Sequence, residues 1–262
     1  MKRLQKQSVL FLLIALLVTS FSACQRPETM TAELWMSTAE AYLEEADYTA
    51  TVTTAFSSAQ EQMAQSVASM QSSNMTVRVS GESFSADMQV KTASAEVNRS
   101  YVMTGGYLYH SNTLKVGEDA VTVKEKAPAS ALDLYLTLEA VSVGASIDSN
   151  DFSNLSMTSD ETKHRVTCTG IRNNALVELN EILGVTTDAS KLIVNSVTYE
   201  AVIENSKFVE TALTVVYTVM TGTEIYELTA TRTTSYTYET VVIAAPADAA
   251  DYTAVSYEEL IK

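Results

Sequence analysis

Apolar and polar residues alternate along most of the chain, which is the pattern of β-strands with one buried face. Residues 48–56 show it clearly, because Tyr48, Ala50, Val52 and Phe56 fall on one face and threonines separate them. The same alternation predicts further strands over residues 75–79, 84–90, 101–104, 107–110, 114–116, 121–123, 155–157, 164–168, 192–204, 208–220, 224–234 and 236–243.

Turn residues separate these stretches and predict that neighbouring strands form hairpins. Gly105-Gly106 divides two short Tyr-containing strands, and Asn205-Ser206 divides two long ones. Residues 80–83 (Ser-Gly-Glu-Ser) and Thr221-Gly222 play the same part elsewhere. The sequence therefore predicts antiparallel meanders.

Helical spacing is confined to a few segments. Residues 32–46 repeat apolar side chains at helical intervals, and residues 174–183 do so before a stop at Gly184. Residues 60–73 suit either a helix or a polar strand. Residues 129–142 are also ambiguous, although Leu134, Leu138 and Val141 favour a helix that begins near Ser130.

This order of elements predicts an α+β fold with a large antiparallel sheet and an N-terminal helix. The expected domain covers residues 31–246, where Pro246 ends the sheet, and residues 247–262 form a polar C-terminal tail.

The N-terminus has the pattern of an export signal. Lys2, Arg3 and Lys6 precede an apolar stretch over residues 8–18, and small residues then lead to Cys24. That apolar stretch is too short for a bilayer core, which takes roughly 20 residues. Residues 1–23 are therefore predicted to be a signal peptide that is removed.

Ser22-Ala23-Cys24 resembles the lipobox of bacterial lipoproteins, apart from Phe21, where that family usually has an aliphatic residue. The resemblance implies that Cys24 becomes the first mature residue and carries a diacylglyceryl group with fatty acyl chains such as palmitate. Residues 24–30 would be a lipidated tether of roughly 20 Å at full stretch. The expected location is the extracytoplasmic face of the cell membrane.

Charge narrows the range of partners. The chain has 32 acidic and 17 basic side chains. Removal of residues 1–23 would take away three of the basic side chains and no acidic one. Nucleic acids and anionic lipid headgroups attract positive charge, so neither is expected as the main partner. With 46% apolar residues the mature chain can build a large core, and disorder is not expected.

A second resemblance concerns the fold. The lipobox, the Gly106–Tyr109 hairpin and the closing segment from Tyr236 to Pro246 are similar to those of lipoproteins of unassigned function from Firmicutes. Their fold is similar to that of LolA, LppX and LprG, and the resemblance covers most of residues 31–246. It implies a curved half-barrel sheet, with the N-terminal helix and one or two others on its concave face, around an apolar cavity for acyl chains.

Signals of catalysis are nearly absent from the sequence. It has no nucleophile elbow, P-loop, dinucleotide fingerprint, Cys-x-x-Cys or His-Glu-x-x-His motif. His110 and His164 fall in different predicted strands, and each is expected to be a surface or strand-face histidine rather than part of a triad or zinc site. Cys168 is expected to be a small buried hydrophobe. No enzyme activity, metal or cofactor is therefore predicted.

The loop from Asp148 to Asn154 lacks the glycine and glutamate of an EF-hand, and a turn is expected there rather than a calcium site.

Tyrosine and methionine in the strands provide the remaining functional hypothesis. They could line a groove for an amphipathic ligand, or tyrosine could simply be a favoured strand residue. The expected function is to hold a hydrophobic, lipid-like ligand, and the alternative is a non-enzymatic interaction or sensing lipoprotein that binds an envelope protein. The predicted ligand-binding residues are Tyr101, Met103, Tyr107, Tyr109, Tyr217 and Tyr226.

Overall fold

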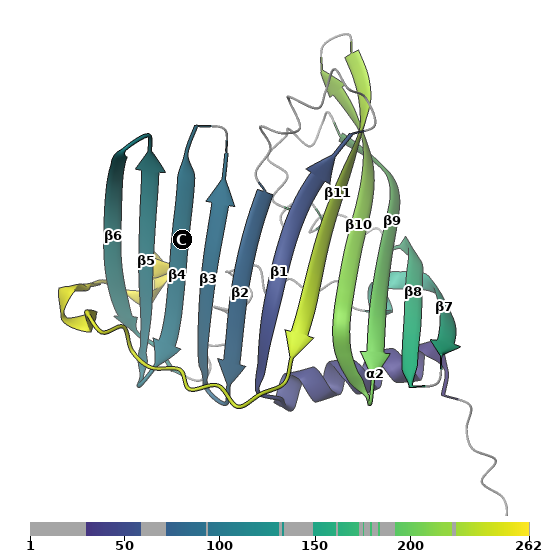
Figure 1. The fold of residues 1–262 in the computed structure, drawn as a ribbon, viewed down its shortest axis with the longest axis horizontal. Coiled ribbons are helices and arrows are strands. Elements are labelled where there is room, and N and C mark those ends of the chain that lie inside the picture. The colour runs from purple at the N-terminus through teal and green to yellow at the C-terminus, as the bar shows by residue number, and fades with distance from the viewer. Residues whose placement is uncertain are drawn as a thin grey trace, which may run out of the picture. The chain divides into compact units, whose positions relative to one another are not determined.

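A single twelve-stranded sheet holds most of the regular secondary structure that is described (Figure 1). The structure is a computed structural model and describes residues 30–58, 72–92, 94–130, 133, 149–160, 162–172, 175, 179, 183, 192–221 and 224–261. The chain divides into one unit from Met1 to Thr31 and another from Ala32 to Lys262, and all elements below belong to the second.

The sheet is open and curved, and its strand order shows two meanders joined in the middle. β1 to β6 follow one another to one edge, β11 back to β7 follow one another to the other edge, and β1 pairs with β11 between them. All pairs are antiparallel except β12 with β6. The strands are β1 (Tyr48–Ser57), β2 (Ser72–Ser80), β3 (Ser83–Lys91), β4 (Glu96–Thr104), β5 (Tyr107–Val116), β6 (Asp119–Pro128), β7 (Phe152–Asp160), β8 (Lys163–Ile171), β9 (Leu192–Glu204), β10 (Lys207–Thr221), β11 (Glu224–Thr237) and β12 (Thr253–Ala254).

The predicted hairpins are confirmed by their strand pairing, and the turns at Gly105-Gly106 and Asn205-Ser206 are confirmed as well. Gly105 and Gly106 both have positive φ, of 61° and 80°, which two-residue hairpin loops require and glycine adopts without strain. Asn205 and Ser206 take the same backbone region between β9 and β10. Strands predicted separately at 107–110 and 114–116 are one continuous strand, β5.

The predicted last strand over residues 236–243 is wrong. β11 continues without a turn to Thr237, where it pairs with Thr49, and residues 238–248 are outside the sheet. The reason is the register, because β1 begins at Tyr48 and offers β11 almost no partner beyond Thr237. Apolar and polar residues go on alternating in the sequence after Thr237, although among the described strands no neighbour is left there to pair with.

The predicted N-terminal helix is confirmed as α2 (Ala32–Glu45), which buries Ala32, Met36 and Ala39 and contacts β7 to β10. Its apolar side chains recur every three to four residues, so they lie on one stripe that packs against the sheet. The signal peptide, Cys24 and residues 59–71 lie outside the described residues, as do most of 129–142 and of the predicted helix 174–183.

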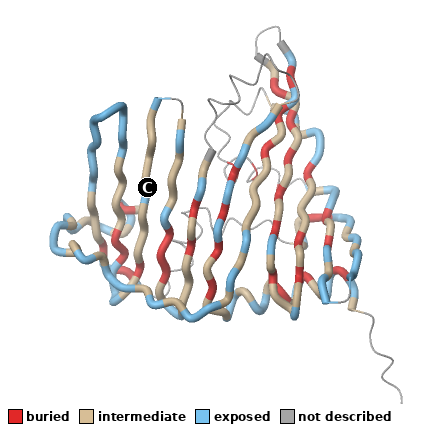
Figure 2. Tube along the Cα trace, viewed as in Figure 1, coloured by how far each residue is buried: buried red, intermediate tan, exposed pale blue. Residues whose placement is uncertain are grey.

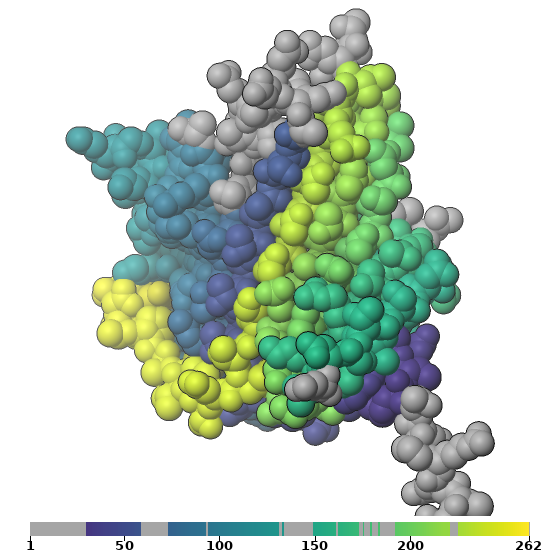
Figure 3. Space-filling view, turned by 45° about the vertical axis from the view of Figure 1, so that its right-hand side comes forward, coloured from purple at the N-terminus to yellow at the C-terminus, as the bar shows by residue number. Residues whose placement is uncertain are grey.

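The segment expected to be a polar tail contains ordered structure that ties it to the β6 edge. η3 (Ala249–Asp251) is followed by β12, which pairs with β6 at Glu125 and Lys126, and then by α6 (Tyr257–Leu260). Figure 3 shows the yellow C-terminal residues following one end of the sheet. Leu260 is only 4% exposed, so the C-terminus contributes to the core.

Most buried side chains of the strands lie on one face of the sheet, called the inner face here, as their register shows. One apolar cluster joins α2 with β7 to β11, and a second joins β1 to β6 with Leu260 of α6. Phe84 and Leu108 in the second cluster have no exposed surface, and burial of a side chain of that size contributes about 1.5–3 kcal/mol. Figure 2 shows buried residues alternating with exposed or half-buried ones along the strands.

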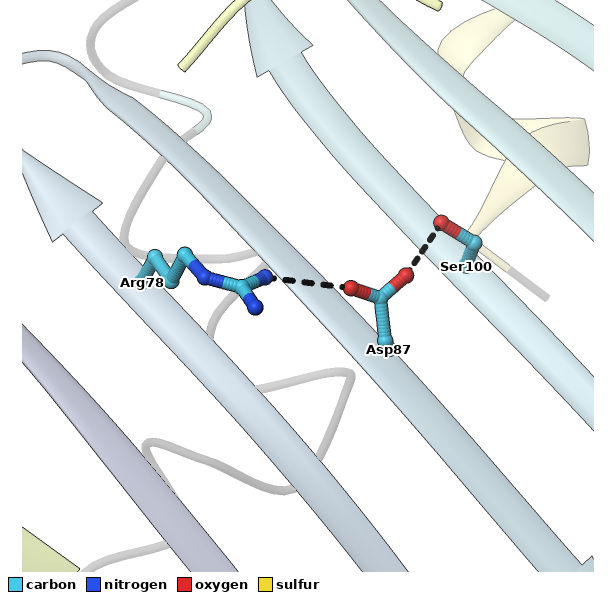
Figure 4. A network of polar contacts seen from close by, with 3 residues as sticks. All are labelled: Arg78, Asp87 and Ser100. Carbon is cyan, nitrogen blue, oxygen red and sulfur yellow. Dashed lines mark hydrogen bonds and ion pairs between the residues drawn. The ribbon is translucent and has the colours of Figure 1, made fainter. Parts of the chain in front are cut away.

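The opposite, outer face is polar. On β2 to β4 the Arg78 guanidinium donates to Asp87 at 3.2 Å, and Ser100 donates to the other oxygen of that carboxylate at 2.8 Å (Figure 4). Arg78 and Asp87 are 39% and 56% exposed, so this ion pair adds little to stability. The outer face is therefore the solvated side of the sheet here.

Candidate ligand-binding face

The structure divides the predicted ligand-binding residues into two groups in different halves of the sheet. Tyr101, Met103, Tyr107 and Tyr109 lie on β4 and β5, whereas Tyr217 and Tyr226 lie on β10 and β11. No single pocket brings all of them together among the described residues.

Within the β4–β5 group only two residues reach the inner face. Met103 is buried in the second apolar cluster, and the Tyr101 ring is packed against that cluster. Tyr107 is exposed, and Tyr109 points to the outer face, where its ring meets the edge of Tyr252 at 5.4 Å between centroids. Tyr109 therefore holds the C-terminal segment.

Tyr217 and Tyr226 are core residues. Tyr217 has no exposed surface and pairs with Leu228, while Tyr226 pairs with Val219. Burial raises the pKa of the Tyr217 phenol to about 12, because the anion would lose its hydration. These two rings fill the first apolar cluster.

A row of polar side chains crosses the inner face of β4 to β6. Tyr101, His110 and Glu125 are paired across the three strands, so all point to the same side. The Tyr101 and His110 rings stack with centroids 4.5 Å apart, and His110 Nδ1 lies 3.9 Å from a Glu125 carboxylate oxygen.

Burial lowers the pKa of His110, and nearby Arg99 lowers it further, although Glu125 acts in the opposite direction. The dominant cause is burial, so the His110 imidazole is neutral near pH 7. The contact with Glu125 is then a polar contact and not an ion pair.

A pH dependence of stability follows from His110. Because its pKa is lower in the folded than in the unfolded chain, the unfolded chain binds more protons as the pH falls below about 6.5. We expect the free energy of unfolding to fall from about pH 7.5 to about pH 5, and His110→Gln to make that fall smaller. Urea unfolding at several pH values measures both, and an unchanged pH profile in the variant would contradict the assignment.

The next row on the same face contains Arg99, Asn112 and Val123, again paired across β4 to β6. His110 Nε2 and Asn112 Oδ1 are both shut off from solvent, and neither has a hydrogen-bond partner among the residues that the structure describes. Buried polar atoms without partners cost stability, so such atoms are rare in native proteins. Sequence reasoning missed this pair, although alternation from Leu108 places His110 and Asn112 on the inner face.

Beyond these polar rows the inner face is apolar but exposed. Leu114, Val116, Val121 and Val123 are 46–66% exposed, and the register of β5 and β6 places them on the same face as buried Leu108 and Ala127. These side chains form an exposed apolar patch near the β5–β6 turn, separated from the core by the polar rows. This combination of an apolar face and two unpaired polar atoms makes the β4–β6 inner face the candidate site.

A shallow depression of about 260 Å³ lies at the turns of the β3–β4 and β5–β6 hairpins. Its lining includes Lys91, Glu96 and Lys115, and Glu96 accepts from Gln89 and Asn98. The hydrogen bonds from Asn98 and Gln89 and the nearby lysines lower the pKa of Glu96, with Asn98 the largest cause. The charged lining of this depression does not suit an apolar ligand.

The other residues considered for chemistry are structural. Cys168 is buried as predicted, and burial with the charges of Glu40 and Glu33 raises its pKa to about 12, so the thiol is unreactive. His164 stacks on Trp35 with centroids 3.9 Å apart. In the loop expected to be a turn, Ser149 donates its N–H to Glu40 at 3.3 Å.

Among the described residues no group of three or more His, Cys, Asp or Glu side chains could hold a metal ion. Within the same part of the chain, none of the helices has the length and apolar character needed to cross a membrane.

Comparison with protein-family models and with curated proteins finds no match for this chain.

Proposed function

We propose that this chain is a lipoprotein, anchored through lipid on Cys24 to the extracytoplasmic face of the cell membrane, that holds a hydrophobic, lipid-like ligand. The ligand would lie on the inner face of β4 to β6. The observation that supports this most directly is the exposed apolar patch of Leu114, Val116 and Val121, which lies on the same face as buried Leu108 but beyond the polar rows. Contiguous exposed apolar surface is typical of binding sites.

The fold is part of this proposal. An open, curved sheet with its apolar clusters on one face is compatible with a LolA-like half-barrel. In that arrangement the inner face would be concave, and α2 would cover the half formed by β7 to β10. The β4–β6 half would then receive the ligand.

A matched pair of variants on adjacent positions of β6 tests the ligand. Val121 points to the inner face and Thr122 to the outer face, and both are exposed. We expect native mass spectrometry of the full chain, purified from a bacterial host in mild detergent, to show bound lipid. Val121→Lys should lose most of it, because an ammonium group on the apolar face is costly to cover with an acyl chain, and Thr122→Lys should retain it.

The absence of lipid from the unmodified protein would contradict the proposal. Equal retention in Val121→Lys and Thr122→Lys would place the ligand elsewhere.

The second candidate function is binding of an envelope protein through the β6 edge. β5 pairs with one edge of β6, and on the other edge β12 pairs only at Glu125 and Lys126, so among the described strands that second edge has no partner from Asp119 to Lys124. An edge of this kind can add a strand from a partner. A partner on this edge should be lost in both lysine variants, whereas a lipid should be lost only in Val121→Lys.

A further inference from the structure

We propose that the polar rows on the inner face of β4 to β6 bind an uncharged hydroxyl group at the polar end of the ligand, such as the glycerol of an acylglycerol. This inference rests on the proposed function and names the chemistry of the ligand. The groups involved are His110 and Asn112 on β5, with Arg99 on β4 and Glu125 on β6.

The register of the sheet brings these groups together. His110 and Asn112 are two residues apart on one strand, so their side chains point to the same face roughly 7 Å apart along β5. Arg99 is paired with Asn112, and Glu125 with His110. The four side chains therefore form a polar block on an otherwise apolar face.

The unpaired atoms indicate what the block lacks. The His110 ring is neutral, and in the tautomer with the proton on Nδ1, the nitrogen 3.9 Å from Glu125, Nε2 is an acceptor. Asn112 Oδ1 is also an acceptor. A group that donates hydrogen bonds would satisfy both atoms.

A hydroxyl fits better than an anion. A carboxylate or phosphate would bring negative charge towards Glu125 and offer only acceptors to acceptors. A hydroxyl both donates and accepts hydrogen bonds. It can therefore bond to Asn112 in either orientation of the amide, and to His110 Nε2 in either tautomer of the ring. With two hydroxyls, one could also accept from the Arg99 guanidinium.

The position of the block also suits an amphiphile. Buried Met103, Leu108 and Ala127 lie on one side of it, and exposed Leu114 and Val121 lie on the other. Arg99 and Val123 are exposed in the same row as Asn112, so a ligand would enter beside these two side chains and displace what now covers the two buried atoms. An acyl chain over Leu114 and Val121 would place its polar end at the block.

Three amphiphiles with the same oleoyl chain test the inference: monooleoylglycerol, oleate and oleoyl lysophosphatidate. Binding of each to the full chain is measured by native mass spectrometry. We expect monooleoylglycerol to bind most tightly and Asn112→Leu to weaken it about 10-fold, or about 1.4 kcal/mol. Binding of oleate should change little, and so should all binding in Thr113→Val, the outer-face control on the same strand.

Two further readouts separate ligand recognition from a role in folding. Asn112→Leu removes a buried acceptor without a partner, so its melting temperature should be equal to or above that of the unmodified protein. His110→Phe keeps a ring against Tyr101 and removes both nitrogens, so it should show the same selective loss.

The outcomes distinguish this inference from the function on which it rests. Equal binding of the three amphiphiles, tightest binding of oleate or lysophosphatidate, or an unchanged preference in both variants would overturn the hydroxyl site and leave the lipid-holding function standing. Failure of all three to bind would overturn both.

Discussion

Cys24→Ala is expected to move the protein from the membrane fraction to the soluble fraction. The resemblance of Ser22-Ala23-Cys24 to a lipobox implies a diacylglyceryl group on Cys24, and two acyl chains anchor a protein stably where one binds only reversibly. Without the thiol neither chain can be attached. Ultracentrifugation of cell lysates followed by immunoblotting measures the change, and mass spectrometry of the N-terminal peptide detects the lipid.

The matched control is Cys168→Ala, the other cysteine of the chain. Cys168 is buried between α2 and the sheet, so its removal costs some packing but leaves the proposed lipidation residue, Cys24, unchanged. This variant should stay with the membrane. Equal membrane association of Cys24→Ala and the unmodified protein would refute lipidation at this residue.

Leu260→Ala should lower the free energy of unfolding by about 2–5 kcal/mol. Leu260 is 4% exposed in α6 and packs in the apolar cluster that contains Phe84 and Leu108, so its truncation leaves a cavity in the core. The Ser256 capping box, in which Ser256 and Glu259 bond each other's backbone N–H, positions this short helix. Urea unfolding followed by circular dichroism measures the loss.

Val242→Ala is the control, because Val242 is 90% exposed in the same C-terminal part of the chain. It should change stability by no more than about 0.5 kcal/mol. If Leu260→Ala were equally mild, residues 256–261 would not contribute to the core.

Local patterns predicted the hairpins and α2 well. Alternation and turn residues act between neighbours in sequence, so β2 to β6 and β9 to β11 could be predicted from Gly105-Gly106, Asn205-Ser206 and the residues around them. The pairing of β1 with β11 and of β12 with β6 depends on residues far apart in the chain, and no local pattern specifies it. The error over residues 236–243 has the same origin.

The site residues were harder to predict because residue type does not specify a sheet face. Tyr107 and Tyr109 alternate with Leu108 and therefore point away from the apolar cluster, although tyrosine suits a ligand-binding groove. The same alternation places His110 and Asn112 inside. Every second residue from Leu108 along β5 lies on the inner face, so this spacing identifies His110 and Asn112. The presence of aromatic residues does not identify them.

The pairing of β1 with β11 also has a consequence for how the chain reaches its native state. β1 comes first and β11 comes last among the long strands in the sequence. Their pairing therefore closes a loop that contains most of the chain, and loops of that size form slowly. The β2–β6 meander can form early from local contacts, but β1 lacks its second neighbour until β11 has emerged. A chain that crosses the membrane N-terminus first would therefore present a bare strand edge until translocation is nearly complete, and we expect a holding chaperone to be needed during that interval.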